Sequence, residues 1–296
     1  MTNMTPDSTD SAGSALDRPL AEDQYLCQVG RSVSCGACCG LYNVADPSRP
    51  ALEKMLRRRT ELFAATARTV ADIDRFAARV TAAENRTRPL DDLHHCPFLG
   101  LIGPARQTAG CLLHPAGNGG TDWRGLSYYG GLACRVYFCP STRLMPVRHK
   151  RLIKTIAPDW HWYGLVITEH SLIDAMLSRL EQELDGLSPD ELLPDENFRQ
   201  ALVSLLGLKA EWPFRPARFD TCCHNMFVSE HPSRPPLEGP LVAGLPPETR
   251  AILEAMGSWF GSPSRVEEAC RLLDRRYAAV VAAAAGSTDR SRSCFG

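Results

Sequence analysis

Seven cysteines in the first half of the chain have side chains and spacing that suit a soft metal ion. Three of them stand in the run Ser34-Cys-Gly-Ala-Cys-Cys-Gly40, and the other four follow singly among glycine, proline and histidine. A Cys-x-x-Cys step allows two thiolates of one tight turn to face the same ion, as in zinc ribbons and in iron-sulfur ligation. The expected metal ligands are Cys35, Cys38, Cys39, Cys96, Cys111, Cys134 and Cys139.

Cys39 follows Cys38 directly, and this adjacency limits what the pair can bind. Neighbouring side chains of an extended segment point to opposite sides. We therefore expect the pair to serve two metals, two irons of one cluster, or one metal and one packing role. A thioredoxin-like redox pair at Cys35 and Cys38 is disfavoured, because it needs the strand and helix of a βαβ unit around it and the sequence indicates neither.

The order of these motifs resembles the bacterial YkgJ-like family of CxxCxxCC cysteine-cluster proteins, which is described as a zinc- or iron-chelating domain. The resemblance covers roughly residues 32 to 140, less than half of the chain. It implies that the seven cysteines are the chelating residues. The matching segments are Cys35-Gly-Ala-Cys-Cys39, Cys96-Pro-Phe-Leu99, Gly110-Cys-Leu-Leu-His-Pro115 and Cys134-Arg-Val-Tyr-Phe-Cys139.

The sequence departs from the family pattern in two places, and the first of them removes its eighth thiol. Ser32 stands where the first cysteine of the family is expected, and the segment from Cys111 to Cys134 is longer than in the family. One ligand is therefore missing or replaced. The candidates for this position are Cys27, the run Cys222-Cys223-His224, and the nearby histidines His94, His95 and His114.

Composition indicates the cellular compartment of the protein but says little about its partners. Twelve cysteines in 296 residues are too few for a disulfide scaffold, and the first residues lack the basic and apolar regions of a secretory signal. We expect a reducing cytoplasm, where clustered cysteines bind metal or do redox chemistry. No run approaches the roughly 18 apolar residues that a membrane-spanning helix needs. A formal net charge of -1 gives no argument for a nucleic-acid partner, and nothing identifies a protein partner.

The predicted fold class is mainly α, a helical domain with an irregular cysteine-rich metal-binding region built from several loops. Apolar periodicity predicts one long helix over 51–85, or two with a break near Thr69, and further helices over 152–184, 194–208, 246–260 and 264–285. Residues 91–140 contain many glycines and prolines, so we expect bound metal to hold them together. The expected divisions are a disordered tail over 1–22, a cysteine-cluster metal-binding region with a long helix over 23–150, a helical C-terminal region over 151–285 and a flexible tail over 286–296.

Zinc and an iron-sulfur cluster both suit these thiols, and single cysteines spread over distant segments favour the cluster. Three functions remain open: a metal-binding protein, a cluster-dependent redox or group-transfer enzyme, and an interaction protein stabilised by zinc. The enzyme stays in view because flagellin lysine methylases are similar in carrying a cysteine cluster of this general kind. A closed four-thiolate shell would indicate a structural role. An enzyme would be indicated by a pocket lined by His94, His95, His114, Arg124 or Tyr128.

Overall fold

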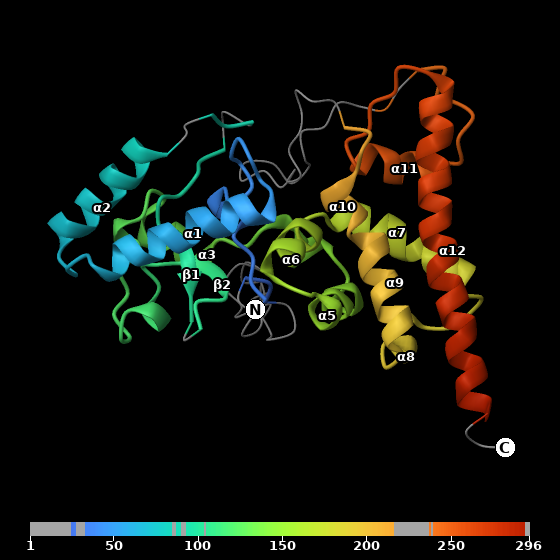
Figure 1. Cartoon of the computed structure of the whole chain (residues 1–296), viewed down its shortest axis with the longest axis horizontal. Coiled ribbons are helices and arrows are strands. Elements are labelled where there is room, and N and C mark those ends of the chain that lie inside the picture. Colours follow the sequence, from blue (N-terminus) through green and yellow to red (C-terminus); the bar gives the residue numbers. More distant parts are fainter. Residues whose placement is uncertain are drawn as a thin grey trace, which may run out of the picture.

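The computed structural model is mainly helical, as the apolar periodicity predicts (Figure 1). It describes residues 25–27, 33–84, 87–89, 93–103, 105–215, 237 and 239–293. The helices are α1 (Arg49–Ala64), α2 (Val70–Ala83), α3 (Gly130–Val136), α4 (Pro140–Leu144), α5 (Val147–Ile156), α6 (Trp160–Ile167), α7 (His170–Glu183), α8 (Pro189–Leu192), α9 (Glu196–Leu206), α10 (Leu208–Glu211), α11 (Pro247–Ala255) and α12 (Pro263–Ser293). The strands are β1 (Leu99–Ile102) and β2 (Thr108–Cys111), and short 3-10 turns are η3 (Ala37–Cys39), η4 (Pro115–Gly117) and η5 (Arg124–Leu126).

The break near Thr69 separates α1 from α2, so the two-helix alternative is confirmed. Thr69 is the N-cap of α2, and its hydroxyl accepts a hydrogen bond of 3.2 Å from the backbone N–H of Asp72. Such a cap satisfies an N–H group that the helix leaves free at its start. α1 begins with Pro50 in its first turn, a position that proline favours. It packs along β1 and thereby supports the cysteine-bearing hairpin.

The expectation that the cysteines lie on irregular loops is not confirmed. β1 and β2 form an antiparallel hairpin in which Leu99 is opposite Cys111, so Cys111 ends a strand. Cys134 lies within α3, and Cys38 and Cys39 lie within η3 instead of an extended segment. Each of these elements is too short to give a periodic signal in the sequence. Backbone hydrogen bonds of the hairpin and of the helices therefore shape the described part of 91–140.

Two separate hydrophobic cores lie behind this arrangement. The N-terminal core includes buried apolar residues of α1, α2, β1 and β2, of the segments beside the cysteines, and Trp160 and Leu165 of α6. The C-terminal core includes buried apolar residues of α5, α6, α7, α9, α11 and α12, together with Leu26 and Val33. Figure 1 accordingly shows α1 and α2 at one end, α9, α11 and α12 at the other, and α5 and α6 between them. Cys35 packs against both cores, which places the cysteine site at their boundary.

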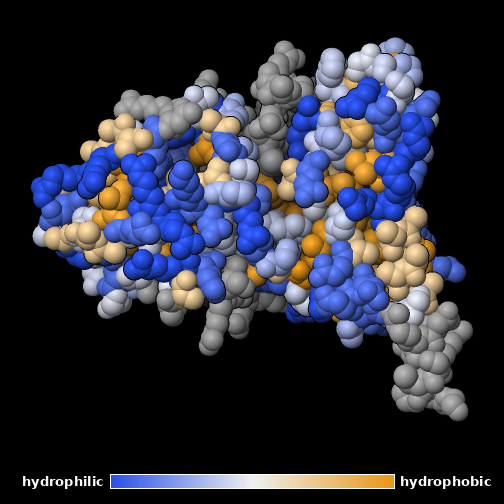
Figure 2. All heavy atoms as spheres, viewed as in Figure 1, coloured by the Kyte–Doolittle hydropathy of each residue, from blue (hydrophilic) through white to orange (hydrophobic). Residues whose placement is uncertain are grey.

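Two further observations concern the long helices and the surface. α12 continues to Ser293, beyond the end expected at 285, because its final turns contain no proline that would stop it. None of the helices in the described part of the chain is both long enough and apolar enough to cross a membrane. In Figure 2 the surface over the α1 end of this face is mainly hydrophilic, in agreement with the exposed charges of α1 around Arg57.

Candidate metal centre

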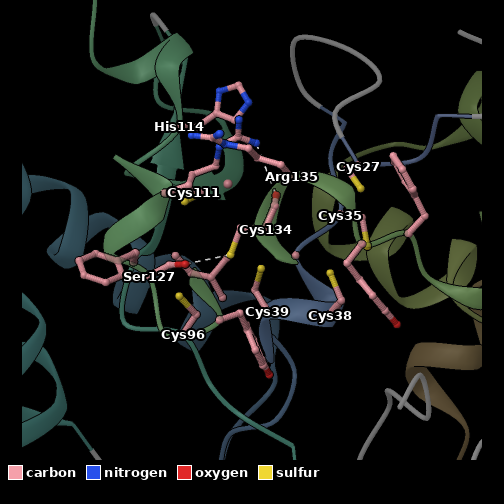
Figure 3. A pocket seen from close by; sticks show the side chains of 18 of the residues that line it. Cys27, Cys35, Cys38, Cys39, Cys96, Cys111, His114, Ser127, Cys134 and Arg135 are labelled. Carbon is pink, nitrogen blue, oxygen red and sulfur yellow. Dashed lines mark hydrogen bonds between the residues drawn. The ribbon is translucent and has the colours of Figure 1, made fainter. Parts of the chain in front are cut away.

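One cavity of about 120 Å³ collects most of the cysteines that the sequence singles out. Six of the seven expected ligands line it, and Cys27 joins them (Figure 3). Cys139 does not line the cavity, but it packs against the same core as Cys35, and burial, followed by the charge of Cys38, raises the pKa of its thiol. All nine cysteines among the described residues are free thiols. The lining cysteines are Cys27, Cys35, Cys38, Cys39, Cys96, Cys111 and Cys134.

The turn from Cys35 to Gly40 brings three thiols to the floor of the cavity. The N–H of Cys39 donates to the carbonyl of Gly36 over 3.1 Å, and the N–H of Gly40 donates to the carbonyl of Ala37 over 2.9 Å. Gly40 has a φ of 78°, in the left-handed region that glycine adopts without strain. A Cβ atom there would overlap the carbonyl oxygen of His94. The turn therefore requires glycine both for its backbone angle and for its packing.

Cys96 and Cys111 reach the same side of the cavity through backbone pairing. The N–H of Cys96 donates to the carbonyl of Cys39 over 2.9 Å, which joins the segment before β1 directly to the turn. Cys111 ends β2 opposite Leu99, and the N–H of Leu112 donates to the carbonyl of Phe98 over 2.8 Å. Two segments remote in sequence thus hold their thiols beside Cys39.

Cys134 enters from α3 and is oriented by polar neighbours. Its Sγ lies 2.9 Å from the hydroxyl oxygen of Ser127, shown by the dashed line in Figure 3. Nη1 of Arg124 donates to the backbone carbonyl of Cys134 over 3.4 Å. Asp122 in turn forms ion pairs of 2.8 Å with Arg124 and 2.9 Å with Arg135. Two guanidinium groups at the rim therefore share one carboxylate, which leaves the rim with net positive charge.

Cys27 lies on the other side of the cavity, next to Cys35, and Cys139 packs against the same core as Cys35. The N–H of Cys35 donates to the carbonyl of Cys27 over 2.9 Å. The ring of Tyr25 contacts that of Phe138 edge to face at 6.2 Å, which brings the neighbours of Cys27 and Cys139 together. Cys139 is the N-cap residue of α4. The sequence offered Cys27 only as one of several substitutes for a thiol at Ser32, and the structure brings it to the cavity.

Burial and the charges of neighbouring thiols raise the pKa values of four cysteines at the cavity. Burial, followed by the charges of Cys38 and Cys139, raises the pKa of both Cys27 and Cys35. Burial, together with the charges of Cys111 and Cys134, raises the pKa of Cys96 to about 12. Burial also raises the pKa of Cys111 to about 11. These groups are protonated thiols at neutral pH, so binding of a metal would displace their protons.

Cys38 differs from the other thiols. The thiol of Cys39 donates a hydrogen bond to it, which lowers the pKa of Cys38 and raises that of Cys39. A hydrogen bond to the charged form stabilises the thiolate. The lowered pKa of Cys38 favours its thiolate, which is the form that binds metal.

Of the three candidate histidines, only His114 lines the cavity. His114 lines the cavity together with Arg124, two of the residues expected at an enzyme's pocket. His95 does not line it, and its two nitrogens already contact Arg59 and the carbonyl of Gly40. His94 stacks on Tyr128 at 3.5 Å, and its ring also contacts Tyr129, which lines the cavity. His94 and Tyr128 are therefore one layer removed from the thiols.

The donor set fits a soft metal in its chemistry, because eight thiols gather at one place. No three His, Cys, Asp or Glu side chains in the ranges that the structure covers are already grouped to hold a single ion. Four sulfurs at about 2.3 Å from one zinc ion must lie within roughly 4 Å of one another, whereas a cluster contributes a core of its own between its ligands. The expected alternatives Cys222, Cys223 and His224, and the position Ser32, lie outside the described residues.

A scan against models of protein families found no match for this chain, and neither the curated proteins nor the solved structures contain a match.

Proposed function

We propose that this protein binds a metal centre through a multi-cysteine site at the boundary of its two cores, and that the centre is an iron-sulfur cluster in preference to zinc. The observation that carries the proposal is the convergence of seven thiols from five chain segments on one cavity, with Cys139 beside them. Thiolates are the preferred ligands of iron-sulfur clusters and of zinc. Membership of the YkgJ-like family, which the motifs resemble, is part of the same proposal.

The preference for a cluster comes from the way the thiols are arranged. They surround a volume of about 120 Å³, and donors that line a cavity suit a ligand with a core of its own. The positive rim formed by Arg124 and Arg135 would offset part of the negative charge of several thiolates. The basic run 143–154, by contrast, does not line the cavity; Lys150 is buried and donates to the carbonyl of Thr142 over 2.6 Å.

Anaerobic purification followed by metal analysis and a visible spectrum tests the proposal. We expect a brown protein that contains iron and acid-labile sulfide, and a Cys38→Ser variant that loses the colour. Cys270, a partly buried cysteine of α12, does not line the cavity and gives the matched control Cys270→Ser, which keeps the colour. A colourless protein with stoichiometric zinc would show that the centre is zinc and not a cluster. A protein free of metal refutes the proposed function.

A second candidate function, a cluster-dependent redox or group-transfer enzyme, is favoured by one observation. His114 and Arg124 line the same cavity as the thiols, so polar side chains are available beside the proposed centre. An enzyme of this kind requires the loaded protein to be reduced and reoxidised reversibly. Redox titration of the purified protein tests it, within the range of about −700 to +450 mV that such clusters span. The zinc-stabilised interaction protein has no observation of its own in its favour.

A further inference from the structure

The eight thiols around the cavity are not evenly distributed. Figure 3 shows Cys27, Cys35 and Cys38 on one side and Cys96, Cys111 and Cys134 on the other, with Cys39 between them. Cys139 belongs with the first side, because it packs against the same core as Cys35 and its neighbour Phe138 contacts the ring of Tyr25 at 6.2 Å.

Backbone contacts define the same two groups independently of the thiols. In the first group, the N–H of Cys35 donates to the carbonyl of Cys27, and the rings of Tyr25 and Phe138 join the flanking segments. In the second, the N–H of Cys96 donates to the carbonyl of Cys39, and the hairpin sets Cys111 opposite Leu99.

Cys134 completes the second group. Its thiol contacts Ser127, and it lies on the same side of the cavity as Cys96 and Cys111 in Figure 3. The hydrogen bond between Cys38 and Cys39 joins the two groups.

We propose that the eight thiols form two separate four-thiolate centres that meet at the Cys38–Cys39 peptide. The first consists of Cys27, Cys35, Cys38 and Cys139, and the second of Cys39, Cys96, Cys111 and Cys134. Each has the four soft donors that one iron-sulfur cluster or one zinc ion takes. This inference rests on the proposed metal-binding function and adds to it the number of centres, the division of the ligands and the assignment of Cys27.

In this arrangement the adjacent residues Cys38 and Cys39 bind one centre each. One peptide supplies a ligand to each centre, so the two centres lie close together and are both anchored by η3. Ligand runs shared between two clusters are known from two-cluster ferredoxins, in which one cysteine of the motif binds the other cluster. Cys27 takes the place that Ser32 leaves vacant in the family pattern, because its carbonyl is bonded to the N–H of Cys35.

Metal content of single variants tests the division. The protein is reconstituted anaerobically, and metal per chain is measured for wild type, Cys27→Ser, Cys35→Ser, Cys96→Ser, Cys111→Ser and the control Cys270→Ser, with far-UV circular dichroism to verify the fold. We expect each of the four cavity variants to lose about half of the metal, the double variant Cys27→Ser/Cys111→Ser to lose nearly all of it, and the control to lose none. A folded single variant that loses the entire load, or Cys27→Ser with the full load, overturns the division.

A measurement on the unaltered chain remains available if the variants fail to fold. Metal-free wild type is titrated with Co²⁺, a coloured substitute for zinc at four-thiolate sites, and thiolate-to-metal absorbance is followed. We expect saturation at two Co²⁺ per chain, whereas saturation at one overturns the division while leaving the proposed function intact. A wild type that takes up neither iron, zinc nor Co²⁺ refutes the proposed function together with the division.

Discussion

Arg59 and His95 are joined by a contact of 2.6 Å between Nη2 and Nε2, and this contact fixes the protonation of the ring. A guanidinium group only donates hydrogen bonds, so Nε2 of His95 must accept. Nδ1 then carries the proton and donates to the carbonyl of Gly40 over 2.6 Å. His95 is therefore neutral, and it links α1 to the turn that holds Cys38 and Cys39.

Replacement of Arg59 by methionine should destabilise the protein strongly. The side chain is 1% exposed, forms an ion pair with Glu84 and donates to the carbonyl of Cys96 over 3.0 Å. Its loss removes the ion-pair partner of Glu84 and leaves the carbonyl of Cys96 with only the 3.4 Å hydrogen bond from the N–H of Leu99. Removal of one partner from a buried pair costs about 3–5 kcal/mol. Urea unfolding of the metal-free protein measures the loss.

The same helix supplies the control for this experiment. Arg57 is 56% exposed and forms only an i,i+4 pair with Glu53, so Arg57→Met should change the free energy of unfolding by no more than about 0.5 kcal/mol. Equal effects of the two substitutions would show that the Arg59 network does not stabilise the fold.

His95 should make the metal-free protein sensitive to mild acid. Burial and the charge of Arg59 lower the pKa of His95 to about 3, against 6.5 for the free side chain. A group whose pKa is lowered on folding contributes stability that is complete above 6.5 and is lost as the pH falls toward 3, by up to about 1.4 kcal/mol per pH unit. Urea midpoints measured between pH 7 and pH 4 should fall less steeply in His95→Gln, which has no proton to gain. Parallel slopes for the two proteins would exclude this assignment.

Metal loading should release protons and strengthen as the pH rises. Burial raises the pKa of Cys96 to about 12 and that of Cys111 to about 11, so both are protonated at pH 7 and must lose their protons to become ligands. The affinity should increase about tenfold per pH unit for each proton displaced. Competition with a chelator of known affinity at pH 6.5, 7.0 and 7.5 gives the slope. An affinity that is independent of pH would contradict thiolate ligation by these residues.

Removal of metal should loosen 91–140 while the later helices persist. Within this region, none of the described residues between 115 and 138 is a buried member of either core, whereas α7, α9, α11 and α12 share the C-terminal core, which includes Phe198, Leu202 and Leu273. Segments with little buried apolar contact open first. Hydrogen exchange before and after verified metal loss should therefore rise in 91–140 and stay unchanged in α9. Unchanged exchange in 91–140 would mean that the hairpin and α3 are stable without metal.

Apolar periodicity and the expected break near Thr69 are local signals of the sequence, and both locate α1 and α2. The residues that line the cavity depend on tertiary contacts instead. Cys27 reaches the cavity only because its carbonyl bonds to the N–H of Cys35, a contact across a segment that carries no periodic signal. Arg57 and Arg59 look equivalent in the run Arg57-Arg-Arg59, and only the packing of α1 on β1 makes one exposed and the other buried. The missing information is tertiary in each case.

Gly40→Ala should disrupt the cysteine turn through backbone strain and through steric overlap. A second substitution, Gly103→Ala, separates these two causes. Gly40 and Gly103 have similar positive φ values, 78° and 84°, so alanine brings comparable backbone strain of about 1 kcal/mol at either position. A Cβ at Gly103 meets nothing within 4 Å, whereas at Gly40 it overlaps the carbonyl oxygen of His94, which is backbone and cannot swing away. Gly40→Ala should therefore lose several times more stability than Gly103→Ala, and it should also lose metal, because the carbonyl of Cys39 would be moved from the N–H of Cys96. Thermal unfolding and metal content of the two variants make the comparison, and equal losses would show that the strain at φ alone determines the effect.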